Sequence, residues 1–113
     1  MMSYSEMNGY WNSLLNQDLN DYAYIRIKKM QSLMRRIEDI DEQFEYQDMH
    51  FGLRILSKNN KNILYRIQYD EEKNIFEVQK LSWDTNSNKI DRSEFRISDE
   101  KEIRSIIIDN SNA

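Results

Sequence analysis

The chain has 113 residues, of which 32% are charged and 39% are hydrophobic, and its formal net charge is −4. Such a length fits a single domain, residues 1–113, and the absence of cysteine excludes disulfides, thiol nucleophiles and thiolate metal sites. No apolar run approaches the roughly 20 residues that cross a bilayer, and the first residues lack a signal-peptide pattern. We therefore expect a cytoplasmic protein with no membrane partner.

Residues 1–20 contain the first predicted helix. Its apolar residues recur at helical spacing: Met7, Trp11, Leu14 and Leu15. Ser3 or Ser5 can cap its start, and Glu6 lies within capping-box reach of Ser3. The polar segment NQDLND separates this helix from the next, for which Asn20 or Asp21 is a suitable N-cap.

The second predicted helix is a long one that spans residues 21–46. Its apolar residues step by three or four and form one stripe: Ile27, Met30, Leu33, Met34, Ile37, Ile40 and Phe44. Arg26 and Asp41 intrude on this stripe, one toward each end. Bases fill the first half of the segment and acids the second, which is the reverse of the order that a helix dipole favours.

From residue 50 the apolar period changes to two, which predicts four strands within residues 50–97. The alternating segments are FGLRIL, NILYRIQY, NIFEVQKLSW and KIDRSEFRI, and they are separated by the polar breaks SKNNKN, DEEK and DTNSN. Strands joined in order by short turns make an antiparallel meander. We expect a buried face with Phe51, Leu53, Ile55, Ile63, Tyr65 and Ile67, and a solvated face with Arg54, Arg66, Gln68 and Glu77.

Ser98 can cap a last, short helix over residues 98–109, in which acids precede the apolar positions. A strand over IRSIIID is the alternative, because β-branched isoleucine favours strands. Residues 110–113 are expected to be a frayed tail. The predicted fold is therefore α+β, with N-terminal helices, a four-stranded antiparallel meander and a C-terminal helix, and with the helices on one sheet face. This layout is similar to cystatin-like and NTF2-like folds in architecture, without a shared motif.

The sequence contains no recognisable catalytic, cofactor or metal site. His50 is the sole histidine, so neither a histidine pair for a metal nor an H-E-x-x-H motif can form. Two glycines cannot build a phosphate-binding loop, and the acidic segments EDIDE and DEE lack the spacing of a calcium loop. We expect that the protein is not an enzyme and needs no cofactor.

The reversed charges of the long helix have two interpretations. In the first, the stripe covers the chain's own sheet and the charges are solvated. In the second, two copies of the helix pair head to tail in a homodimer, with a pivot between Leu33 and Met34, so that Arg26 lies opposite Asp41. The interface residues of the helix would then be Arg26, Lys28, Lys29, Met30, Leu33, Met34, Ile37, Glu38, Asp39 and Asp41.

We predict a small protein-binding domain of the inhibitor, immunity or host-modulating kind, because the chain offers exposed amphipathic surface without catalytic groups. Abundant Asn and Ile with scarce Ala and Pro are typical of an AT-rich genome, such as that of a phage or a low-GC bacterium. Trp83, at a strand end beside a polar turn, is a further candidate interface residue, since tryptophan is enriched in binding hot spots.

Two other functions are compatible with the sequence. A nucleic-acid-associated protein would use the basic half of the long helix, with Tyr22 and Tyr24 for stacking, although the net charge opposes binding to phosphates. A small ligand would occupy a pocket between helix and sheet.

Overall fold

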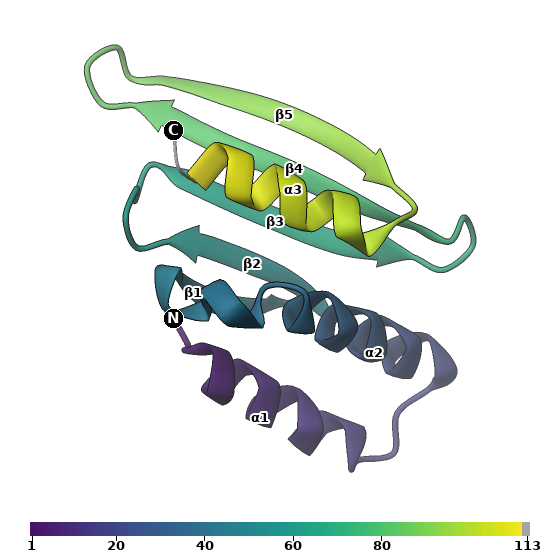
Figure 1. Cartoon of the computed structure of the whole chain (residues 1–113). Helices are drawn as coiled ribbons and strands as arrows, with labels where there is room; N and C mark the ends of the chain where they lie inside the picture. Colours follow the sequence, from purple (N-terminus) through teal and green to yellow (C-terminus); the bar gives the residue numbers. More distant parts are fainter. Residues whose placement is uncertain (112–113) are drawn as a thin grey trace.

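The computed structural model describes residues 1–111 and combines one antiparallel sheet with three α-helices (Figure 1). The helices are α1 (Tyr4–Leu15), α2 (Asp21–Arg35) and α3 (Glu100–Ser111), and a short 3-10 helix, η1 (Glu38–Gln43), follows α2. The strands are β1 (Phe44–Met49), β2 (Gly52–Ser57), β3 (Ile63–Asp70), β4 (Ile75–Asp84) and β5 (Lys89–Ile97). Each strand pairs with the next one along the chain. The predicted α+β class and antiparallel meander are confirmed.

The predicted long helix is wrong, because α2 ends at Arg35 and residues 36–46 adopt other structures. Ile37 and Ile40 have φ angles of −119° and −120°, outside the helical range. A helix continued from here would place a run of acids at its negative C-terminal end. The apparent reversal of charge therefore marks a helix boundary, and α2 itself has the favourable order, with Asp21 in its first turn and Arg35 in its last.

A contact from α3 lies at this boundary. Arg104 of α3 donates a hydrogen bond to the backbone carbonyl of Arg36 and two more to the carboxylate of Asp39, with N–O distances of 2.6 and 2.9 Å. The first bond satisfies a carbonyl that the end of α2 leaves without an intrahelical partner. The second pair is the bidentate geometry that suits a guanidinium and a carboxylate.

The meander has five strands, because the chain forms an additional strand, β1, that begins at Phe44, within the last residues of the predicted long helix. Phe44 and Tyr46 point into the core, and Glu45 and Gln47 point away from it. Phe44 also lies four residues after Ile40, so its spacing satisfies a helical stripe as well as a strand. That ambiguity explains why the prediction of four strands is wrong.

The other elements agree with the sequence. The four predicted strands are β2 to β5. The predicted turn DTNSN ends in Asn88, which has a left-handed φ of 59°, and Asn74, placed by the prediction at the start of a strand, lies in the β3–β4 turn with a φ of 54°. The helical interpretation of the last segment is confirmed over the strand alternative, and α3 extends to Ser111, into the expected tail. Residues 112 and 113 lie outside the described part of the chain.

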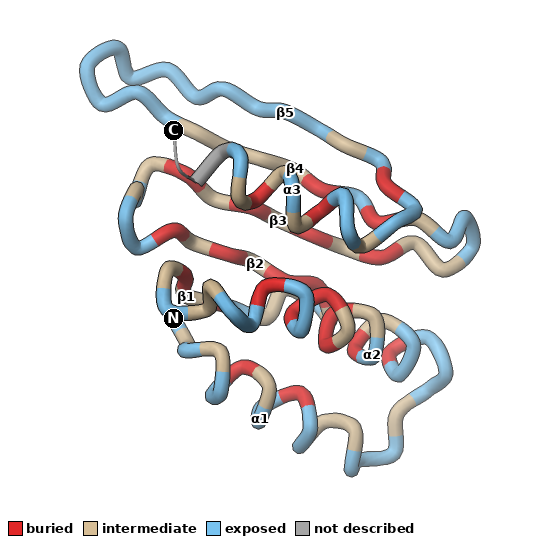
Figure 2. Tube along the Cα trace, in the orientation of Figure 1, coloured by how far each residue is buried: buried red, intermediate tan, exposed pale blue. Residues whose placement is uncertain are grey.

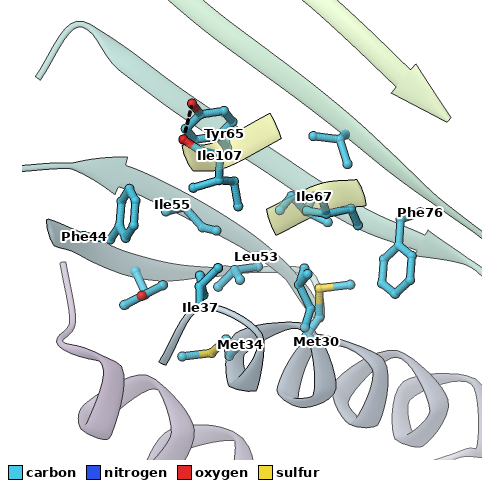
Figure 3. Packing of buried hydrophobic residues seen from close by; sticks show 14 of the residues in the cluster. Met30, Met34, Ile37, Phe44, Leu53, Ile55, Tyr65, Ile67, Phe76 and Ile107 are labelled. Carbon is cyan, nitrogen blue, oxygen red and sulfur yellow. Dashed lines mark hydrogen bonds between the residues drawn. The ribbon is translucent and has the colours of Figure 1, made fainter. Parts of the chain in front are cut away.

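The core lies between the sheet and the helices, as Figure 3 shows. The apolar stripe of α2 packs on β2 and β3, and the hydroxyl of Tyr65 in β3 donates to the carbonyl of Ile107 in α3 at 3.4 Å. The prediction that Phe51 belongs to the buried face of the sheet is wrong, because Phe51 lies half-buried in the β1–β2 turn. Buried side chains of α2 and of the sheet, among them Met30, Leu53 and Ile67, pack together in the space between helix and sheet.

Candidate functional site

One face of the sheet carries no helix, and we call it the open face. Residues directly opposite each other on neighbouring strands share a face, so the pairing register identifies its members. Two rows cross all five strands on this face: Glu45–Leu56–Leu64–Leu81–Arg92 and Gln47–Arg54–Arg66–Gln79–Glu94. The described helices contact the sheet on its opposite face (Figure 1).

Two arginines occupy the centre of the open face. Arg54 of β2 lies directly opposite Arg66 of β3, an arrangement in which the like charges repel. Neutral groups are their hydrogen-bond partners: Arg54 donates to the amide oxygen of Gln47 at 3.1 Å, and Arg66 donates to the sulfur of Met49 at 3.3 Å. Among the described residues neither guanidinium has a carboxylate within salt-bridge distance.

Arg54 is incompletely satisfied. Its Nε is shielded from solvent and has no hydrogen-bond partner among the residues that the structure describes. A shielded donor without an acceptor costs free energy, and the cost is larger for a charged group. The centre of the open face therefore holds a charged donor that the described residues leave without an acceptor.

A hollow of about 360 Å³ lies beside Arg66, open to solvent on the same face. Its walls are polar and carry both signs of charge, with contributions from Gln68, Glu77 and Arg96. His50 and Met49 of the β1–β2 turn form one side of it. In that turn His50 and Phe51 have φ angles of 51° and 64°, which a two-residue type I′ hairpin requires but which strain residues other than glycine.

At the other end of the open face, the β4–β5 hairpin extends past the helices (Figure 1). Trp83 lies opposite Ile90 there, with 36% and 68% of their surfaces exposed. Leu81 and Arg92 form the next cross-strand pair toward the sheet centre. Figure 2 shows β5 exposed here and β4 half-buried until the tip of the hairpin. Trp83 and Ile90 thus form an exposed apolar pair next to Arg92, outside the core.

The structure separates the predicted interface residues of the long helix into buried apolar residues and charged residues nearer the surface. The four apolar ones, Met30, Leu33, Met34 and Ile37, are fully buried within the chain. They pack on the chain's own sheet, as the first interpretation of the stripe expects. The head-to-tail pairing register assumes one helix from Arg26 to Asp41, and α2 ends before it reaches that far.

Two of the four basic residues of α2, Arg26 and Lys29, have partners inside the chain. Arg26 forms an ion pair with Glu71 at 3.3 Å and lies 3.8 Å from the centre of the Tyr22 ring. The ammonium of Lys29 lies 5.0 Å from the ring centre of Tyr69. Lys28 is exposed. These contacts leave less free positive charge on this helix than the sequence suggests.

The acids of the predicted interface belong to η1. The guanidinium of Arg104 holds the pKa of Asp39 below its ordinary value by hydrogen bonding to the ionised carboxylate. Glu38 is exposed, and Asp41 is half-buried near the buried Tyr46. Burial raises the pKa of the Tyr46 hydroxyl, and the negative charge of Asp41 raises it further.

Sequence reasoning identified Trp83 but not the rest of the open-face cluster. The alternation of β2 and β3 does indicate that Arg54 and Arg66 point away from the core. Their position opposite each other depends on strand register, which a short polar loop of variable geometry does not reveal. The pairing of Trp83 with Ile90 follows in principle from the turn DTNSN, since consecutive antiparallel strands align around their turn.

Within the described residues, no group of three or more His, Cys, Asp or Glu side chains is arranged to hold a metal ion. None of the described helices is long and apolar enough to cross a membrane. Comparison of the chain with protein-family models, with curated proteins and with solved structures gives no match.

Proposed function

We propose that the chain is a small, non-catalytic protein-binding domain, of the inhibitor or immunity type and acting in the cytoplasm, which receives an acidic segment of a partner protein on its open face. The observation that carries the proposal is the central pair of arginines, opposed to each other and without a carboxylate partner in the described part of the chain. Carboxylates of a partner would satisfy both guanidinium groups in bidentate geometry.

The neighbouring apolar residues support the same proposal. Leu56, Leu64 and Leu81 form one row beside the arginines, and Trp83 extends it onto the projecting hairpin. Tryptophan and arginine are the residue types that most often dominate binding energy when they are buried at an interface. An apolar row flanked by arginines suits a partner segment that alternates acidic and apolar side chains.

The charge of this surface favours such a partner over a basic one. Three arginines, Arg54, Arg66 and Arg92, adjoin the leucine row, whereas Glu45 lies at its far end on β1. Glu94 accepts a hydrogen bond from the amide of Gln79 at 3.0 Å. Electrostatic complementarity of this kind speeds encounter and selects the partner more than it adds affinity.

The alternative, a nucleic-acid-associated protein, has weaker support. Phosphate contacts dominate such affinity, and Arg26 and Lys29 are already engaged with Glu71 and Tyr69. The net charge of −4 also opposes it. The two classes differ in the surface they use, α2 or the open face, so one set of variants distinguishes them.

The test is affinity capture from lysate of the native host with three forms of the chain: wild type, Arg66→Glu and Tyr10→Ala. Tyr10 is an exposed aromatic residue on α1, remote from the open face, and serves as the matched control. We expect a partner that binds the wild type and Tyr10→Ala but is lost with Arg66→Glu. Circular dichroism of each variant verifies that the fold is retained.

Two results would contradict the proposal. One is a partner that binds Arg66→Glu as tightly as the wild type, which would place the binding site elsewhere. The other is a salt-sensitive shift of a simple oligonucleotide that Lys28→Glu abolishes and Arg66→Glu does not, which would favour the nucleic-acid function on α2. Titration of the captured partner's acidic segment, as a synthetic peptide, then locates the contact by chemical-shift changes on the open face.

A further inference from the structure

The two edges of the sheet are treated differently by the fold. On the β1 edge, Met2 exchanges two backbone hydrogen bonds with Tyr46, at 2.7 and 2.8 Å, and so occupies the middle of that edge. On the other edge, β5 pairs with β4 alone among the described residues. Its second row of backbone amides and carbonyls is therefore open along nine residues, Lys89–Ile97.

This open edge lacks several of the usual obstacles to further pairing. Proteins protect edge strands by making them short, by charged side chains, by bulges, by proline or by a covering segment, and of these β5 has only the charged side chains. β5 pairs with β4 residue for residue without interruption, and the chain contains no proline. Its charges are of both signs, Arg92 and Arg96 against Asp91 and Glu94, rather than the uniformly positive set that repels another copy.

We propose that β5 pairs with β5 of a second copy, antiparallel, about a twofold axis through Ser93. Ser93 is the midpoint of the strand, so this register pairs all nine residues of both copies. A twofold axis perpendicular to the sheet keeps the same face upward in both copies and joins the two sheets into one.

The charges of β5 match this register, and of the neighbouring registers only a centre at Phe95 also pairs opposite charges, Glu94 with Arg96. With the axis at Ser93, Arg92 lies opposite Glu94 of the second copy, and the same ion pair recurs by symmetry. An axis moved by one residue, to Arg92 or to Glu94, places that residue opposite its own copy, where like charges repel. A twofold axis two residues away, at Asp91, likewise places a charged residue opposite its own copy. An axis at Phe95 leaves only the last five residues of each strand paired.

The monomer structure already presents these groups suitably. Arg92 and Glu94 lie on the open face, and the amide of Gln79 donates to Glu94 at 3.0 Å, which orients the carboxylate. Ile90 lies opposite Arg96 of the second copy in this register, so the aliphatic stem of the arginine covers an isoleucine that is 68% exposed in one copy. The pairing uses a strand edge, so it leaves the apolar stripe of α2 in the core of each copy.

The test is sedimentation equilibrium of the full chain over a wide range of concentration. We expect the wild type to pass from the monomer mass of 13.8 kDa to about twice that value as concentration rises. Arg92→Glu and Glu94→Arg should each remain monomeric, since each places like charges opposite each other twice. A mixture of the two variants should dimerise, because every cross-strand pair at positions 92 and 94 is then of opposite sign.

Arg96→Glu is a charge reversal on the same face of the same strand, with Ile90 rather than a charge opposite it in the dimer. It removes the arginine stem that covers Ile90 but creates no directly opposed like charges, so it should dimerise more weakly than the wild type and more tightly than Arg92→Glu or Glu94→Arg. A wild type that stays monomeric at the highest concentrations would overturn the proposal. So would dimers that survive in the single variants, or a mixture of folded variants that fails to associate. Each outcome is independent of the proposed function, which is read from partner capture by Arg66→Glu.

Discussion

β3 and β5 are strands of similar length in one sheet, but they lie in opposite environments. In β3 every second residue is buried under the helices, from Ile63 to Tyr69. In β5 both faces are exposed until Phe95 and Ile97, at the end nearest α3. The contrast is visible in Figure 2, where the buried segments concentrate in the middle of the sheet and β5 is exposed along most of its length.

The difference shows that two separate forces hold the sheet together. Burial of apolar area beneath α2 and α3 stabilises β2 and β3. The outer part of β4 and β5 has little apolar area to bury and depends on backbone pairing, with five registered residue pairs from Lys80↔Ser93 to Asp84↔Lys89. The face covered by the helices should therefore determine stability, and the open face with the uncovered hairpin should determine what the protein contacts.

The strongest test of this division compares two apolar truncations. Leu53→Ala removes a fully buried side chain from β2 and should lower the free energy of unfolding by about 2–5 kcal/mol. Ile90→Ala removes a side chain that is 68% exposed and should change it by no more than about 0.5 kcal/mol. Urea unfolding at low protein concentration measures both. Comparable losses in the two variants would show that the hairpin contributes to the core.

Glycine substitutions probe the packed region at closer range. A Cβ on Gly52 would lie 2.7 Å from the carbonyl oxygen of Ile67 and 3.0 Å from that of Met49, both backbone atoms that cannot move aside cheaply. Gly52→Ala should therefore cost about 1–3 kcal/mol. Gly9→Ala is the control: nothing lies within 4 Å of its Cβ, so the better helix propensity of alanine should stabilise α1 by about 0.5–1 kcal/mol. Equal signs for the two changes would contradict this account.

The turn between β1 and β2 lies where the covered and uncovered regions meet, and it stores strain. His50 is exposed and has a φ of 51°, a conformation that costs about 1–2 kcal/mol for an L-residue. His50→Gly should raise the free energy of unfolding by about 1 kcal/mol, as thermal and urea unfolding would reveal. Destabilisation would mean that the imidazole makes a contact worth more than the strain.

The smallest expected effect concerns the ion pair between η1 and α3, which belongs to neither face of the sheet. Arg104 lowers the pKa of Asp39 in the folded state below the unfolded value of about 4. The pair therefore stabilises the fold above that value, and its contribution is lost as pH falls through the depressed folded pKa. Asp39→Asn should shift the urea midpoint slightly downward near neutral pH and leave it unchanged in strong acid. A difference that grows on acidification would contradict the assignment.

Local patterns predicted much of this fold because they are short-range. The alternation from β2 to β5 and the capping box of Ser3 and Glu6 depend on neighbouring residues, and the structure confirms them. The contact at the end of α2 comes from Arg104, which is 68 residues away from Arg36 in the sequence, so no local pattern contains that contact. Similarly, Phe44 fits both the helical spacing and the strand alternation of apolar residues. Its pairing with Ser57 of β2 makes it part of a strand.

The open-face cluster was harder to predict than the fold. That Arg54 and Arg66 point away from the core follows from alternation. That they oppose each other follows from register, which the loop between Ser57 and Ile63 sets through its hydrogen bonds. Trp83 was identified because its position beside a polar turn is a local property. The partner of Trp83 on β5 becomes evident only when the two strands are aligned.

The short contact between Met2 and Tyr46 has a consequence for stoichiometry. An assembly built by edge-to-edge addition grows without limit when each copy has two usable edges, and it closes at two copies when each has one. By occupying the centre of β1, Met2 removes one of the two edges. A chain in which Met2 did not pair with Tyr46 would have two open sheet edges, which is the geometry of a filament subunit. The two backbone hydrogen bonds between Met2 and Tyr46 prevent this.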